Sequence, residues 1–596
     1  MRRFLSKYKF QLCIFFGIFL FKTIINLAFG TLVMTTGQDE FGTVASASYF
    51  AGYDWSAMVS EIKYYGFGYS MLMAPIYWIT DNPQIIFQVM IGFNSICLGI
   101  SGVICYNILK DIFEINDDKF NVIASLASVF FTCVMLNSNT VFNECALMMI
   151  EWLMVYLLLL MQRRKDSGKS TLVLTIIFSL VSVYAFTVHT RIIYVLGASF
   201  IFIVFYFILK RKFLVNVPAF VGIMGVGYIL VQKLIKYVQL KIWLTNDPEK
   251  LKNSVSNLGG YFGNIKYLKT GTGIKGFVYT LWGEVYGMFS LSGGIFAIAI
   301  CIFAFIILSL IFKKKMKQVD GKLITLASFI CSLMMAVLLL TALGVLDLVE
   351  ENVLAGTASR WYLYTRYWAM CGQLAVMFVL LFFKKQEKAG KGIIISSVVL
   401  FSVVSAAFIL KMGKMFYIYQ GAKSNAFSSY LGMLVMKTDE YFSTGAFVKM
   451  TVIAAVVLVL SLVCIKFRKT GIMAVVLLCL FLYSYGYTTV MLDVPTSKEI
   501  QSEFKDVREA VRDSGIDDNA KVYVRTSSKS RPYRFGAQFN LFEYRITTEK
   551  LDDSADKAVI LSDSDKYGEK GYELIYKKED SSFYDTVYVW AKGYQK

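Results

Sequence analysis

Residues 10–30 read FQLCIFFGIFLFKTIINLAFG, an almost uninterrupted apolar run. At a rise of ~1.5 Å per residue, a helix of this length crosses a hydrocarbon core of ~30 Å. Comparable runs recur along the chain as far as residue 492. Of the 596 residues, 56% are hydrophobic and only 17% are charged, and the mean hydropathy is +0.56. The sequence therefore predicts a polytopic, all-α membrane protein and excludes a soluble globular class.

We expect about thirteen membrane spans from the positions of these runs. They cover residues 10–30, 84–109, 120–137, 145–162, 171–188, 191–209, 213–232, 283–312, 323–346, 367–383, 392–411, 448–465 and 471–492. The basic start at Met1 resembles a signal peptide, but its apolar stretch is too long, which predicts an uncleaved first span. Residues 65–80 are a candidate for a further, half-buried helix.

Lys and Arg residues gather in alternate loops, which predicts a cytoplasmic N-terminus and an outer C-terminus. The loops expected inside contain clusters such as Arg163-Arg164-Lys165 and Lys210-Arg211-Lys212, whereas the short outer loop 138–144 has neither residue. The inner loop 110–119, with more acids than lysines, departs from this pattern. Much of the formal net charge of +19 is thus a topology signal, and no nucleic-acid partner is expected.

The composition changes after Val494-Pro495, where the chain becomes charged and rich in β-branched and aromatic residues. We therefore divide it into residues 1–494, the membrane part, and residues 495–596, a small extracytoplasmic α/β domain. A helix ending at Gly515 and strands at 521–524, 558–561, 573–576 and 586–590 are expected there. This tail has no Walker loop, GxSxG elbow or metal cluster, which favours a stabilising or acceptor-docking role.

An acidic pair, Asp39-Glu40, follows the first span by about nine residues, at the start of a long first outer loop (31–82). Short juxtamembrane helices are expected near 41–50 and 55–62, lying in the interface plane. These carboxylates stand where a lipid-borne substrate and water can both reach them. The alternative is that Asp39 caps the following helix.

A third acid, Glu144, lies in the short turn before the fourth expected span, and Glu151 follows it two helical turns later. Carboxylates at or below the membrane interface are costly unless they are paired or face a wet cavity. Both are therefore functional candidates, with a structural helix-to-helix partnership as the alternative for Glu151.

Basic candidates also lie at outer turns. His189, the only histidine, and Arg191 lie between the fifth and sixth expected spans, and a single histidine excludes a multi-histidine metal site. Arg360 and Arg366 lie in a later outer loop that re-enters the membrane at Arg366. Arginine binds phosphate through bidentate hydrogen bonds, and its alternative role here is a snorkelling side chain in an aromatic belt.

This arrangement resembles the GT-C integral-membrane glycosyltransferases, which include protein O-mannosyltransferases and aminoarabinose transferase. The resemblance rests on an acid soon after the first span, a second acid before the fourth span, outward arginines and a C-terminal extracytoplasmic domain. It implies that Asp39, with Glu40 beside it, is the general base and that Glu144 is the second loop acid. It also implies donor-phosphate binding by Arg366, with Arg191, Arg360 and His189 as weaker candidates. Some members of the family hold a divalent cation, for which Asp39 and Glu144 would be ligands to Mg or Mn.

The resemblance further implies sugar transfer from a polyprenyl-phosphate-linked donor to a glycan, lipid or protein acceptor outside a bacterial cytoplasmic membrane. A single displacement would invert the anomeric centre, and the outer loop 233–275 is a candidate lid. Two alternatives remain open: a transporter or flippase of lipid-linked sugars, and a noncatalytic scaffold. A flippase would show inverted repeats and broken helices near the midplane, and we see no repeat in the sequence.

Overall fold

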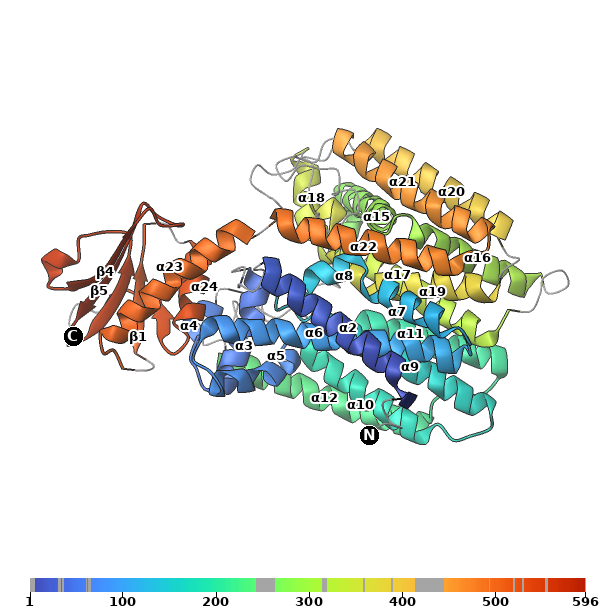
Figure 1. Ribbon diagram of the computed structural model, residues 1–596, viewed down its shortest axis with the longest axis horizontal. Helices are drawn as coiled ribbons and strands as arrows, with labels where there is room; N and C mark the ends of the chain where they lie inside the picture. Colours follow the sequence, from blue (N-terminus) through green and yellow to red (C-terminus); the bar gives the residue numbers. More distant parts are fainter. Residues whose placement is uncertain are drawn as a thin grey trace.

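The computed structural model describes most of the chain. The described residues are 6–29, 34, 37–60, 62, 66–242, 263–312, 319–356, 360–386, 390–412, 444–492, 494–517, 520–527, 530–551 and 556–594. Long helices, most of them running in the same general direction, form the main body, and a small C-terminal domain built around a β-sheet extends from one end of it (Figure 1). Of the expected lid at 233–275, the structure describes residues 233–242 and 263–275, and the stretch between them lies outside the described residues.

Ten helical segments are long and apolar enough to cross a membrane, judged by length and composition over the described ranges. They are α2 (Lys9–Phe29), α6 (Pro83–Asn107) continued by the π-helical turn η2 (Ile108–Ile112), α9 (Glu144–Asp166), α11 (Ile192–Lys210), α12 (Val217–Ile242), α17 (Gly321–Gly344), the segment Trp361–Lys385 that ends in α19 (Ala369–Lys385), α20 (Gly390–Ala407) continued by η6 (Phe408–Met412), α21 (Thr444–Lys466) and α22 (Thr470–Leu492). The chain is therefore a multi-pass integral membrane protein.

Three of the thirteen expected spans differ from single long helices. The segment expected at 283–312 belongs to two helices, α15 (Gly271–Leu291) and α16 (Ile295–Ile311), bent by 105° where Gly293 and Gly294 take positive φ angles. The segment at 120–137 is broken into α7 (Asp118–Val129) and α8 (Thr132–Asn137), and that at 171–188 is the shorter helix α10 (Leu172–Val188). Counting the bent pair as one span gives up to 11 candidate spans among the described residues, judged by length and composition, and α7–α8 and α10 occupy the other two expected positions.

The segment expected to form the first outer loop folds into short helices that lie between the main body and the C-terminal domain (Figure 1). These are α3 (Gln38–Ala51), α4 (Ser56–Val59), α5 (Gly68–Met73) and the 3-10 helix η1 (Ala74–Trp78). Helix α3 ends at Gly52, whose φ of 108° suits glycine, between the two short helices expected near 41–50 and 55–62. The second expected helix is only four residues long, and the half-buried helix considered at 65–80 is shared between α5 and η1.

Another group of short helices precedes α15 and α19: η3 (Asn264–Lys269), α18 (Leu346–Leu354), η4 (Arg360–Leu363) and η5 (Thr365–Trp368). The last of these carries Arg366 directly into α19. The chain thus re-enters the helical body at this arginine, as its sequence predicted.

The C-terminal domain contains α23 (Val494–Asp513), β1 (Lys521–Arg525), α24 (Arg531–Asn540), β2 (Arg545–Thr547), β3 (Ala558–Ser562), the 3-10 turn η9 (Gly568–Lys570), β4 (Glu573–Glu579) and β5 (Thr586–Lys592). Its sheet has the order β2-β1-β3-β5-β4. Strand β1 pairs in parallel with β2 and β3, whereas β5 pairs antiparallel with β3 and β4. The four expected strands are confirmed within a mixed sheet; α24 and β2 were not expected.

The C-terminal domain packs directly onto the segment that contains these short helices. Phe535 of α24 stacks on Phe41 of α3, with ring centroids 4.1 Å apart and planes inclined by 7°. The indole of Trp55 donates a hydrogen bond to the carbonyl of Phe542 over 3.0 Å, and Arg512 pairs with Asp81 at 3.0 Å. The domain therefore shares a core with the helix that carries the acidic pair.

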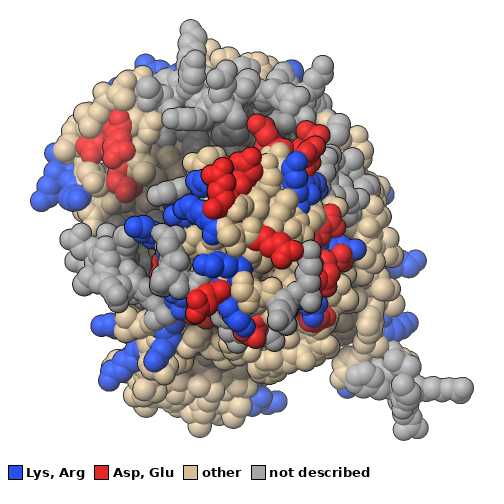
Figure 2. Space-filling model, turned by 90° about the vertical axis from the view of Figure 1, so that its left-hand side faces the viewer, with Lys and Arg blue, Asp and Glu red and all other residues tan. Residues whose placement is uncertain are grey.

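The end of the molecule formed by the C-terminal domain carries charges of both signs. Acidic and basic side chains lie interspersed over the part of this face that the structure describes (Figure 2). The net positive charge is thus not concentrated there as a one-sign surface of the kind that nucleic-acid-binding proteins use.

Candidate functional site

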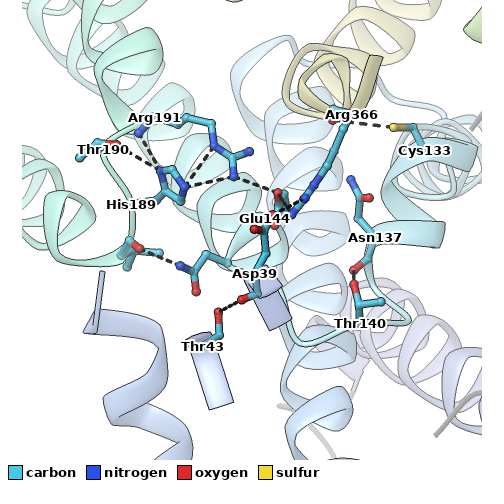
Figure 3. Close-up of polar contacts among 12 residues, drawn as sticks. Asp39, Thr43, Cys133, Asn137, Thr140, Glu144, His189, Thr190, Arg191 and Arg366 are labelled. Atoms are coloured by element: carbon cyan, nitrogen blue, oxygen red, sulfur yellow. Dashed lines mark hydrogen bonds and ion pairs between the residues drawn. The ribbon is translucent and has the colours of Figure 1, made fainter. Parts of the chain in front are cut away.

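Five residues singled out from the sequence come together in space: Asp39, Glu144, His189, Arg191 and Arg366 (Figure 3). They come from the first turn of α3, the first turn of α9, the turn between α10 and α11, and the 3-10 turn before α19. Each residue sits at the end of a helix, where the chain enters or leaves the helical body. This is why distant parts of the sequence converge at one level.

Arg366 is the centre of the cluster. Its Nη1 lies 2.5 Å from Asp39 Oδ2, and its Nη2 lies 2.6 Å from Glu144 Oε1. One guanidinium therefore bridges two carboxylates through separate nitrogens, and its face packs over the ring of Phe142 at 4.0 Å. This geometry fixes the plane and position of the cation.

The two carboxylates differ in their exposure. The Asp39 side chain is 30% exposed, whereas that of Glu144 is 2% exposed. Glu144 also pairs with Arg191, whose Nη2 lies 3.0 Å from the same Oε1. Glu144 is thus the buried counter-ion of two arginines, and Asp39 is the acid that a substrate or water can reach.

His189 is buried against Arg191. Its Nδ1 faces the backbone N–H of Arg191 at 3.0 Å, and its Nε2 faces the guanidinium Nη2 at 3.1 Å. A neutral imidazole accepts a hydrogen bond through only one of its ring nitrogens, so only one of these two contacts is made to a lone pair. Burial and the adjacent Arg191 hold the pKa of His189 well below its usual value, so the ring is uncharged near neutral pH. Burial alone would lower the pKa of Arg191, but Glu144 outweighs this and raises it.

Several polar atoms of the cluster are buried without a hydrogen-bond partner among the described residues. They are Glu144 Oε2, Arg191 Nη1 and Arg366 Nε. Buried polar groups are normally satisfied, and unpaired guanidinium donors are costly in a low-dielectric setting. Two N–H donors from two arginines thus remain available to an anionic ligand.

The remaining predicted site residues lie elsewhere. Glu40 is fully buried, and its Oε1 accepts the backbone N–H of Val141 over 2.8 Å, so it ties α3 to the turn before Glu144. Arg360 begins η4, but its side chain lies outside the described part of the structure. The helix-capping alternative for Asp39 is wrong, because the N-cap of α3 is Gly37 and the Asp39 carboxylate pairs with Arg366 instead.

The divalent cation considered as a possibility from the resemblance does not fit this arrangement. Asp39 and Glu144 are joined through the guanidinium of Arg366, which occupies the space a metal ion between them would need. No group of three or more acids, histidines or cysteines suited to a metal occurs in the described ranges. A dication beside two arginines would be repelled, so we assign no step to a metal.

The sequence did not point to four residues that shape the cluster. Phe142 lies under Arg366, and the ring of Tyr367 lies 4.5 Å from the Arg191 guanidinium. Asn137 has a buried, unpartnered amide nitrogen. Glu284 of α15 binds the segment around Arg366. The two aromatic residues adjoin predicted site residues in sequence, so cation–π pairing was a usable signal for them.

Comparison with known proteins places these features in context. No protein-family model matches the chain, and no curated protein sequence matches it. The chain is similar in structure to ArnT. The crystal structure of ArnT from Cupriavidus metallidurans bound to undecaprenyl phosphate aligns with a TM-score of 0.46 and 11% sequence identity, covering 97% of each chain. The apo state of ArnT aligns with a TM-score of 0.45 and 10% identity over the same shares.

Proposed function

We propose that this protein is a membrane glycosyltransferase that moves a sugar from a polyprenyl-phosphate-linked donor to an extracytoplasmic acceptor. The observation that carries the proposal is the Arg366–Glu144–Arg191 cluster, in which Glu144 and Arg191 are buried, with a partly exposed carboxylate, Asp39, at its rim. The resemblance of the sequence to the GT-C enzymes supports the same assignment. The acceptor is a cell-wall or surface glycan, a lipid or a protein, and the membrane is a bacterial cytoplasmic membrane.

The arginines are suited to the donor phosphate. A polyprenyl chain partitions into the bilayer and leaves its phosphate at the interface. We expect this interface at the turn where η5 leads into α19. Arg366 Nε and Arg191 Nη1 are unpartnered donors in the described structure, and each can bind a phosphate oxygen. They would stabilise the negative charge that builds on the phosphate as its bond to the sugar breaks.

Asp39 is suited to act as the general base. Only its Oδ2 is engaged by Arg366, and its Oδ1 has no hydrogen-bond partner among the residues described. The carboxylate can therefore accept the proton of an acceptor hydroxyl as that oxygen attacks the anomeric carbon. The new glycosidic bond forms as the bond to phosphate breaks, so the anomeric centre is inverted. A phosphate on Arg366 would also compete with Asp39 for the guanidinium.

The topology supports this use of the site. The pattern of Lys and Arg residues favours a cytoplasmic N-terminus, and this orientation puts the cluster and the C-terminal domain outside. We propose that residues 495–596 support the first outer loop and border the acceptor side of the site, because Phe535 packs on the helix that carries Asp39.

The decisive experiment combines purified protein in liposomes, a polyprenyl-phosphate sugar labelled in the sugar, and membranes of cells lacking the protein as the acceptor source. We expect label to move into the acceptor fraction. Asp39→Asn should abolish transfer yet retain binding of polyprenyl phosphate, whereas Arg366→Gln should lose both. Asp54→Asn is the matched control, because Asp54 lies in the same outer loop but pairs with Arg545 of the C-terminal domain.

Undiminished transfer by Asp39→Asn would refute the proposed general base. If labelled lipid crossed the bilayer with no transfer to any acceptor, the protein would instead be a flippase of lipid-linked sugars.

A further inference from the structure

Glu284 is a fully buried carboxylate on α15 that binds the segment carrying Arg366. Its Oε1 accepts the backbone N–H of Tyr364 over 2.5 Å, and its Oε2 accepts the indole N–H of Trp368 over 2.7 Å. Both oxygens are therefore satisfied by neutral donors.

The two donors flank Arg366 in sequence. Tyr364 precedes it by two residues and Trp368 follows it by two, so one carboxylate holds both ends of the turn η5. A 3-10 turn of this length has few internal hydrogen bonds to define it. External anchors at its two ends thus set the direction in which the Arg366 side chain leaves the backbone.

The residue before Glu284 allows this close approach. A Cβ placed on Gly283 would lie 2.0 Å from the backbone carbonyl oxygen of Tyr362, which is far inside contact distance. A side chain at this position would push the 360–368 segment away from α15. Gly283 and Glu284 together form a docking point for the segment.

We infer that Glu284 is a positioning residue that orients Arg366 through Tyr364 and Trp368. This inference rests on the proposed function, because it assigns to Glu284 the alignment of the arginine that binds the donor phosphate. Glu284 itself contacts no reacting atom in this scheme. Its loss should let η5 shift, so that Arg366 reaches Asp39, Glu144 and the phosphate less well.

Double-mutant cycles with Glu284→Gln and Arg366→Lys test this inference. The first measurement is binding of a polyprenyl monophosphate in detergent micelles, with the corresponding polyprenyl alcohol as a probe lacking the phosphate. We expect Glu284→Gln to weaken phosphate binding about tenfold. The new side-chain amide N–H would face an N–H donor, either the backbone of Tyr364 or the indole of Trp368, in place of an acceptor. In the Arg366→Lys background the same change should have little further effect. Trp368→Phe, which removes only one hydrogen bond, should show a smaller effect of the same kind.

The second measurement is the midpoint of thermal unfolding, which needs no ligand. It compares the four proteins of the cycle: the wild type, Glu284→Gln, Arg366→Lys and the double variant. Non-additive effects are expected there too, because Arg366 forms its ion pairs only when the turn is held in place. Additive effects in both measurements would overturn the role assigned to Glu284. If the wild-type protein bound no polyprenyl phosphate, the proposed function would fail, while coupling in the unfolding cycle would still decide whether Glu284 orients Arg366.

Glu350→Gln is the matched control. Glu350 is also a buried acid with neutral donors, the hydroxyls of Thr270 and Thr272. Thr270 precedes Glu284 by 14 positions, about 21 Å along a helix, which places this contact well away from Arg366. Its replacement should lower the unfolding midpoint without coupling to Arg366. Equal coupling of both acids to Arg366 would indicate general destabilisation and would contradict the inference.

Discussion

Arg366 Nη2 lies 2.6 Å from Glu144 Oε1, and the Glu144 side chain is only 2% exposed. The same oxygen also faces Arg191 at 3.0 Å, so two guanidinium groups depend on one buried carboxylate. Asp39 pairs with the other terminal nitrogen of Arg366, Nη1, and its side chain is 30% exposed. The cluster thus contains one acid that stabilises the arginines and a second acid that is accessible.

This difference predicts that the two acids contribute unequally to stability. Glu144→Gln should lower the free energy of unfolding by about 3 kcal/mol or more, because it leaves two arginines without their buried counter-ion. Asp39→Asn should lower it by about 1 kcal/mol or less, because the exposed part of this ion pair is screened by water. Chemical denaturation in detergent measures both, and equal losses would contradict the division of roles.

The lowered pKa of His189 makes the stability of the folded protein depend on pH. Its pKa is lowered in the folded protein, so the unfolded chain binds a proton first as the pH falls below about 6.5. Stability is therefore unaffected above that value and is lost below it, by up to about 2 kcal/mol between about pH 6.5 and about pH 5. Since His189 is the only histidine, His189→Gln should remove this contribution.

Unfolding midpoints at about pH 7 and about pH 5 compare the two proteins directly. The wild type should lose more stability than His189→Gln over this interval. An equal loss would mean that other groups cause the pH dependence and that the ring is not held neutral.

The site could be predicted from the sequence where polar residues interrupt the ends of apolar runs. Asp39, Glu144, Arg191 and Arg366 were recognisable because charge is costly at the membrane interface unless it has a use. Their mutual pairing could not be predicted, because it depends on how four separate helix ends meet. The positions of most spans followed from hydropathy alone.

Glu284 was missed because it fell at the start of an expected continuous span over 283–312. The break at Ser292-Gly293-Gly294 was visible as a glycine pair inside an apolar run, a known signal of a helix end. Similarly, Ser530 followed by Pro532 marks the start of α24, where the Ser530 side chain accepts from the N–H of Tyr533. The strands of the C-terminal domain were easier to find, since β-branched residues dominate them.

Lys22 is a basic residue buried within a span, and we expect its removal to cost little stability. Its ammonium is fully buried and donates to Asn139 and, over 2.8 Å, to Tyr485, both neutral groups. Lys22→Met should therefore change the free energy of unfolding by no more than about 1 kcal/mol, since removing the charge also removes its desolvation cost. Tyr485→Phe should cost about 1–3 kcal/mol, because it leaves the charge with one acceptor fewer. A reversed order in denaturation measurements would show that the ammonium itself stabilises the contact between α2 and α22.

Phe535 connects the C-terminal domain to the helix that carries the proposed base, Asp39. The Phe41 ring is stacked between Phe535 at 4.1 Å and Trp55 at 5.6 Å, and Phe41 lies two residues after Asp39 on α3. Phe535→Ala should cost about 3–5 kcal/mol of stability through the cavity it leaves. It should also reduce sugar transfer, because α3 loses the contact that fixes the direction of Asp39.

Phe583→Ala is the control for this prediction. Phe583 packs against Phe504 and Tyr533 within the C-terminal domain, so its loss should destabilise that domain while transfer is retained at temperatures where the protein stays folded. Transfer assays and unfolding midpoints of both variants separate the two effects. If both variants lost transfer in proportion to stability, the domain would act only as a structural support, and the Phe535–Phe41 contact would have no specific part in orienting Asp39.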